Sequence, residues 1–175
     1  MGLSWGPLVL HLATVPINAQ TITCPDWSLL MISSGTPNLS RPARNKNPGN
    51  LRAPSLAVAQ RLYGKESVVG LDDSGHVQFA DWPAGVAAVR QDVRVKVSGR
   101  SATKLPANPS IKAFSRVYAE DPQHATKLAS LLSVSSTSRI GIDVQEEAFL
   151  RALIRLEGGL DTWVAVAPLL AGEIV

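Results

Sequence analysis

Glu157 is the residue whose type and position most clearly suit chemistry. The sequence predicts a helix that starts at Asp143 and places Glu157 in its last turn, before two glycines at 158–159. A carboxylate there meets the negative end of the helix macrodipole, which disfavours it by about 0.3–1 kcal/mol. The same field favours the protonated form that a general acid needs. The alternative is a solvated glutamate paired with Arg151 or Arg155.

Other chemically useful residues have simpler structural interpretations. The acidic pair at 72–73 is typical of a turn, and Asp81 is typical of a helix N-cap. Trp82 suits either the core or stacking on a sugar or base. His76 and His124 have no partner at a diagnostic spacing, and we assign them no role. The sequence therefore offers no clear second carboxylate to work beside the one at the helix end.

The composition excludes several classes of protein. The single cysteine, Cys24, rules out an intrachain disulfide and a zinc site built on paired thiolates, and the three histidines are too far apart for a helical metal pair. Glycine-rich nucleotide-binding motifs and the serine-hydrolase elbow are absent. We therefore expect no metal and no cofactor, and any chemistry must rest on carboxylates, amides and basic groups.

Charge divides the chain into a leader and a domain. The 175 residues are 45% hydrophobic and carry 17 basic against 14 acidic side chains, yet no basic residue precedes Arg41. The leader at 1–40 contains an apolar run at 7–15 that resembles a weak signal segment, but it lacks a positive start and is too short to span a membrane. A flexible arm is the alternative. The sequence thus predicts one domain at 41–175, whose basic excess suits an anionic partner.

Local patterns predict an α+β, mainly helical fold. Two short strands flank an Asp-Asp-Ser-Gly turn, which is typical of a β-hairpin. Valines at three- and four-residue steps then indicate an amphipathic helix, and shorter helical patterns follow. The predicted strands are 67–71 and 76–79, and the predicted helices are 82–97, 109–118, 121–132 and 143–157.

The sequence at 44–52, Arg-Asn-Lys-Asn-Pro-Gly-Asn-Leu-Arg, resembles the signature of a family of phage and prophage proteins described as virion-associated peptidoglycan hydrolases or lytic transglycosylase-like proteins. Further similar segments lie at 75–79, 110–126 and 149–159, so the resemblance covers about residues 41–165. It implies a lysozyme-like fold, in which a catalytic glutamate at a helix end faces a small β-hairpin across a groove. Here the chain order is reversed, so we expect a permuted arrangement.

The resemblance also implies a function. Glu157 is expected to act as the single acid/base that cleaves the glycan bond between N-acetylmuramic acid and N-acetylglucosamine, in a lytic transglycosylase or a muramidase. A second carboxylate is not needed if the muramic 6-hydroxyl captures the cleaved carbon, which favours the transglycosylase. The expected substrate-binding residues come from the signature loop and the hairpin region: Asn45, Asn47, Asn50, Arg52, Gln78 and Trp82.

The implied partners are peptidoglycan glycan strands and other virion proteins, and the implied location is a phage virion or the periplasm and cell wall. The sequence departs from the family pattern at 119–122 and has Leu156 where a histidine often precedes the glutamate. These departures motivate the alternative of a noncatalytic virion or cell-wall-binding structural protein. No nucleic-acid partner is expected, since no basic stripe is interleaved with aromatic residues.

Overall fold

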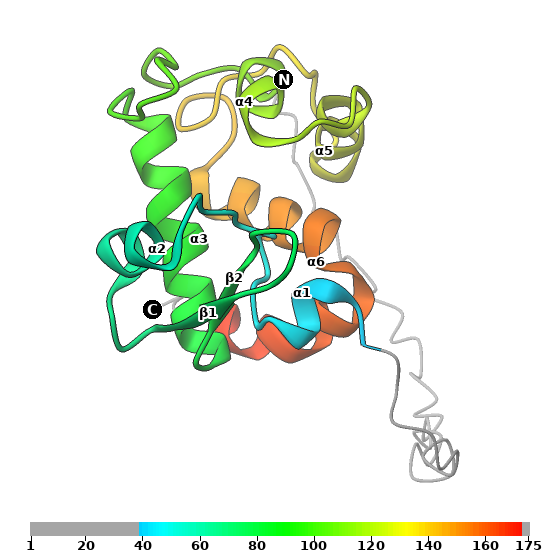
Figure 1. Cartoon of the computed structure of the whole chain (residues 1–175). Helices are drawn as coiled ribbons and strands as arrows, with labels where there is room; N and C mark the ends of the chain where they lie inside the picture. The colour runs from blue at the N-terminus through cyan, green and yellow to red at the C-terminus, as the bar shows by residue number, and fades with distance from the viewer. Residues whose placement is uncertain (1–38, 173–175) are drawn as a thin grey trace, which may run out of the picture. The chain divides into compact units, whose positions relative to one another are not determined.

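A computed structural model describes residues 39–172, which belong to one compact unit at 37–175 (Figure 1). All but the last two positions of the predicted leader lie outside the described residues, as does Cys24. Helices predominate in the described part beside one two-stranded antiparallel sheet, so the α+β fold class is confirmed. The elements are α1 (Arg41–Arg44), α2 (Leu56–Tyr63), β1 (Val68–Leu71), β2 (Val77–Phe79), α3 (Trp82–Val97), α4 (Ile111–Tyr118), α5 (His124–Leu132) and α6 (Glu146–Ala171).

The predicted hairpin is present as β1 and β2. Leu71 pairs with Val77, and the register is irregular nearer the start of β1. Asp72 closes the turn, because its Oδ1 accepts hydrogen bonds from the backbone amides of Ser74 and His76, both at 2.9 Å. The acidic residue of the turn motif is thus a structural part of the hairpin, as its sequence indicated.

The amphipathic helix predicted at 82–97 is α3, with the predicted bounds. Asp81 caps it by accepting a hydrogen bond from the amide of Ala84 at 2.8 Å. A Cβ built on Gly85 would lie only 2.0 Å from the carbonyl oxygen of Lys46, so this glycine lets the signature loop lie directly against α3. The valine stripe faces the core and is formed by Val86, Val89, Val93 and Val97.

Several helices differ from the sequence predictions. The short helix α1 and the helix α2 were not predicted, and α2 is capped by the Ser55 hydroxyl, which accepts from the amide of Val58 at 3.3 Å. The helix predicted from residue 121 begins instead at His124. Asp121 accepts a hydrogen bond from the amide of Gln123 at 2.8 Å, which makes a turn ahead of α5 rather than its first residues.

The prediction for the helix that carries Glu157 was wrong at both of its ends. It begins at residue 146 after Gln145, and Asp143 is not its N-cap, because the Asp143 carboxylate accepts from the amide of Arg139 at 2.7 Å. The glycines do not end the helix: α6 continues to residue 171 through a kink at Gly159, where φ is 73° and ψ is −173°. Glu157 therefore lies at the end of the first segment of a kinked helix.

The core joins α6 to the helices around it. Phe149 of α6 and Phe114 of α4 meet edge to face, with ring centroids 4.8 Å apart, and both are fully buried. Figure 1 shows α6 between the α4–α5 pair on one side and α1 with the hairpin on the other. None of the helices in the described part is long and apolar enough to cross a membrane.

Candidate functional site

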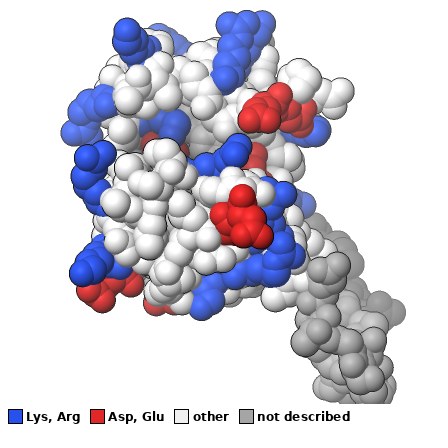
Figure 2. Space-filling view, viewed as in Figure 1, with Lys and Arg blue, Asp and Glu red and all other residues white. Residues whose placement is uncertain are grey.

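An open cleft of about 750 Å³ lies where the hairpin side of the unit meets the helical side. Its lining comes from α1, the loop at 49–52, the end of α2 at Tyr63 and the hairpin turn, and from α3, α4, α5 and α6. Figure 2 shows Lys and Arg side chains spread over the face seen there, with Asp and Glu side chains among them. This face of the unit is therefore mixed in sign, and specific side chains in the cleft must determine what it binds.

Glu157 lies in the wall of this cleft, and its side chain is 15% exposed. Its Oε1 is 2.8 Å from Nε2 of His124, while Oε2 has no hydrogen bond within the described residues. Arg151 does not pair with it but lies 3.3 Å from the carboxylate of Glu147, one turn earlier on the same helix. Glu157 is thus held by the buried ring of His124 and is not paired with Arg151 or Arg155.

His124, the first residue of α5, is the functional-site residue that sequence reasoning missed. Its side chain is 3% exposed, and its Nδ1 lies 2.9 Å from Oγ of Ser115. The ring of Tyr118 stacks on it at an interplanar angle of 24°. Glu157 is 33 positions away in the chain, so no local spacing in the sequence could reveal this contact.

Tyr118 ties the two sides of the cleft together. Its hydroxyl donates a hydrogen bond to the carbonyl oxygen of Gly49 at 2.5 Å, which joins α4 to the signature loop. Burial raises the pKa of Tyr118 well above its ordinary value, and the negative charges of Asp92 and Glu157 raise it further. The phenol therefore remains a hydrogen-bond donor over the physiological pH range.

A second carboxylate, Asp92 of α3, also lines the cleft, which the sequence analysis did not predict. One of its oxygens forms an ion pair with Lys96, one turn along the helix. Its other oxygen, Oδ2, is buried without a hydrogen-bond partner, and so is Oδ1 of Asn50 in the signature loop. Both atoms are acceptors buried in the wall of the cleft and not exposed to it.

The structure separates the seven predicted site residues, Glu157 and the six substrate-binding residues implied by the resemblance, into two groups. Glu157, Asn50 and Arg52 line the cleft. Arg52 is exposed and lies 3.8 Å from Glu120, on the opposite side, in a weak ion pair. The other predicted residues do not line the cleft: they are Asn45, Asn47, Gln78 and Trp82.

Asn47 is fully buried and serves the backbone of the signature loop. Its side-chain amide donates to the carbonyl oxygens of Leu51 and Val77, both at 2.9 Å, and its Oδ1 accepts from the amide of Leu51 at 2.8 Å. Trp82 is partly buried against the core. Asn47 therefore stabilises the backbone of the loop that lines the cleft, without lining the cleft itself.

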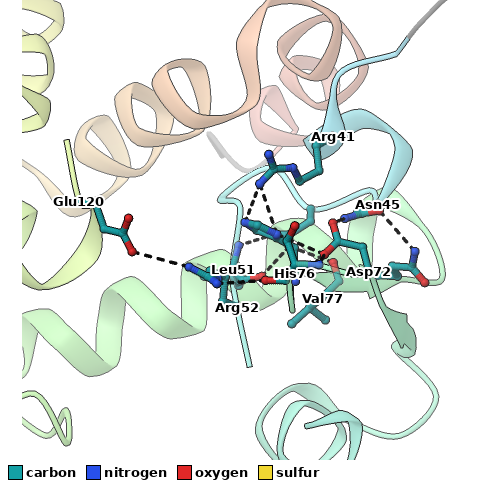
Figure 3. A network of polar contacts seen from close by, with 11 residues as sticks. Arg41, Asn45, Leu51, Arg52, Asp72, His76, Val77 and Glu120 are labelled. Carbon is teal, nitrogen blue, oxygen red and sulfur yellow. Dashed lines mark hydrogen bonds and ion pairs between the residues drawn. The ribbon is translucent and has the colours of Figure 1, made fainter. Parts of the chain in front are cut away.

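A polar network joins the hairpin turn to α1 and the loop (Figure 3). Asn45 donates to the Asp72 carboxylate at 2.9 Å and contacts Gln78 at 3.5 Å, while buried His76 lies between Asp72 and Arg41. Burial acts to raise the pKa of Asp72, but the hydrogen bonds from the His76 and Ser74 amides and from Asn45 outweigh it and hold that pKa at about 2. Asp72 is therefore ionised wherever the protein is folded near neutral pH.

Residues 39–172 contain no group of three or more His, Cys, Asp or Glu side chains arranged to hold a metal ion. No protein-family model matches the chain, and no curated protein matches it. The residues of the cleft and the resemblance carried by the signature loop are therefore the basis for a function.

Proposed function

We propose that the protein cleaves the peptidoglycan glycan strand between N-acetylmuramic acid and N-acetylglucosamine, as a lytic transglycosylase. One observation carries this proposal: the Glu157 carboxyl group lies in the wall of an open cleft, with one oxygen fixed and the other without a partner within the described residues. The signature loop, on whose resemblance the substrate rests, lines the same cleft.

In this proposal the protonated Glu157 gives its proton to the glycosidic oxygen as the bond to the sugar carbon breaks. The oxocarbenium-like carbon is then captured by the muramic 6-hydroxyl, whose oxygen forms the new bond and whose proton returns to Glu157. The product carries a 1,6-anhydro ring, and the enzyme ends in its starting state. Capture by water yields a reducing end instead, which is the muramidase outcome.

The proposal includes the lysozyme-like arrangement, in permuted chain order. Its support is that the segment ending at Glu157 and the hairpin side of the unit line the same cleft. Asn50 and Arg52 are the predicted binding residues that fit the proposal best, since both line the cleft and a guanidinium suits an anionic wall. Asn45 and Asn47 support the loop from within, and a virion or periplasmic location is part of the same proposal.

Mass spectrometry of muropeptides released from purified sacculi tests the proposal. The unmodified protein should release anhydro ends, and Glu157→Gln should lower that rate by about 100-fold or more, because the amide has no acidic proton to give. Glu146→Gln is the matched control, since Glu146 is an exposed glutamate in the first turn of the same helix and does not line the cleft. It should leave the rate unchanged.

Equal release by the Glu157→Gln protein would contradict the assignment of the acid. Retention on sacculi without any released product from the unmodified protein would instead support the noncatalytic cell-wall-binding alternative.

A further inference from the structure

We propose that His124 is a positioning residue that determines which oxygen of Glu157 carries the acid proton. The inference rests on the proposed function and deepens it. His124 belongs to α5 and Glu157 to α6, and the 2.8 Å contact between Nε2 and Oε1 joins them. The ring is almost completely buried, so the contact is shielded from water that would otherwise compete for it.

The donor and acceptor roles follow from the chemistry of the groups. An ionised carboxylate can only accept, so the proton in the contact belongs to Nε2 of His124. In a neutral ring Nδ1 is then an acceptor, and the hydroxyl of Ser115, 2.9 Å away, donates to it. The ring plane is held by the stacked Tyr118. Ser115 and Tyr118 thus fix the tautomer and the orientation of His124.

The consequence for Glu157 concerns its two oxygens. Oε1 already accepts the Nε2–H hydrogen bond, so a proton that binds the carboxyl group goes to Oε2. Oε2 has no partner within the described residues, and Glu157 lines the cleft. The acid proton is therefore placed on the oxygen that is free to meet the glycosidic oxygen, and the returning proton is accepted at the same atom.

Two substitutions separate the hydrogen bond from the packing. His124→Phe keeps a ring against Tyr118 but removes both nitrogens, and it should lower kcat about 10- to 100-fold with KM changed less than about threefold, because a misplaced acid slows the chemical step rather than glycan binding. His124→Gln offers an amide N–H at a similar reach and should recover at least about one third of the lost activity on a logarithmic scale.

A matched control tests whether any loss is only structural. Leu128→Ala removes a fully buried side chain from the same helix, and Leu128 does not line the cleft. This control should lower the melting temperature at least as much as His124→Phe, yet leave kcat within about twofold when activity is measured well below melting. Equal kcat for the His124→Phe and Leu128→Ala proteins would overturn the proposal.

Nuclear magnetic resonance of ¹⁵N-labelled histidine provides a readout that does not depend on activity. In the full chain at neutral pH, His124 should show a proton on Nε2 that is protected from exchange, and its ¹⁵N shift should change in Glu157→Gln. A proton on Nδ1 with a bare Nε2 would overturn the proposal. If Glu157→Gln kept full activity, the proposed function would fail, while the spectra would still report whether His124 directs the proton of Glu157.

Discussion

At the scale of single residues, Asn47 and Asn50 of the signature loop have different roles. The side chain of Asn47 is fully buried and makes three hydrogen bonds to backbone groups of the loop and β2. Asn50 lines the cleft, and its Oδ1 is buried without a partner among the described residues. Asn47→Ala removes three buried hydrogen bonds and leaves the Leu51 amide without a partner among the described residues, although the Leu51 carbonyl keeps its bond from the Val77 amide. It should therefore lower the free energy of unfolding by about 2–4 kcal/mol. Chemical denaturation measures this change.

Asn50→Gly is the control for this comparison, because Asn50 has a positive φ of 53° that glycine adopts without strain. It should change the free energy of unfolding by less than about 1 kcal/mol while weakening retention on sacculi. Equal destabilisation by the two substitutions would show that the unpaired oxygen of Asn50 is part of the loop's support and not of the binding surface.

Asp72 makes the hairpin turn sensitive to acid. Its pKa in the folded protein is about 2, which is below that of an aspartate in an unfolded chain. As pH falls, the unfolded chain therefore binds the proton first, so the stabilisation present above about pH 4 is lost between about pH 4 and pH 2. Asp72→Asn should be less stable at pH 7 and lose less stability over that window. Thermal unfolding at several pH values measures both; parallel curves for the two proteins would contradict the prediction.

At the scale of elements, the kink in α6 depends on Gly159. Its φ of 73° and ψ of −173° lie in a region that is essentially confined to glycine. Gly159→Ala should therefore lower the free energy of unfolding by about 1–3 kcal/mol. Gly172→Ala is the matched control: Gly172 has φ of −74° and open space around a built Cβ, so it should be close to neutral. Circular dichroism melting curves compare the two variants. Equal stability would show that alanine adopts the backbone conformation of the kink without strain, which would contradict the prediction.

The elements that were predictable from the sequence are those whose signals are local. The turn at Asp72 and the cap at Asp81 are each formed by residues within four positions, so the hairpin and α3 were predicted with nearly correct bounds. The start of α6 was not, because the Asp143 side chain turns back to the amide of Arg139 instead of capping the helix. The end of that helix was also predicted wrongly, because a glycine pair such as the one at 158–159 is compatible with a kink in a helix as well as with its end.

The same distinction holds for the candidate site. The dipole argument selected Glu157 from local sequence, and the structure places it in the cleft. Its partner His124 is 33 positions away and Asp92 lies on another helix, so only the packing of α3, α5 and α6 brings these groups to one cleft. No spacing rule in a single sequence contains that information.

At the scale of the whole molecule, Ser40, near the start of the described residues, is tied to α6 beside the candidate site. The amide and hydroxyl of Ser40 both donate to the Asp161 carboxylate, each at 2.9 Å. The hydrogen bond from the Ser40 amide has the largest effect on the Asp161 carboxyl group and lowers its pKa. The carbonyl oxygen of Pro42 accepts from the amide of Asn47, which connects α1 to the signature loop at 2.9 Å. Stability of the cleft should therefore require residues that precede the signature.

Two truncated chains test this requirement. A chain of residues 37–175 keeps Ser40 and α1 and should unfold cooperatively, with the protected Nε2 proton of His124 present in its spectrum. A chain of residues 45–175 retains the signature loop almost whole but lacks the Ser40–Asp161 bonds and buried Ala43, so it should be less stable by about 2 kcal/mol or more. Urea denaturation of both proteins measures the difference. Equal stability would mean that α1 is dispensable, and the loop and α6 would then have to hold the cleft by their own contacts with α3.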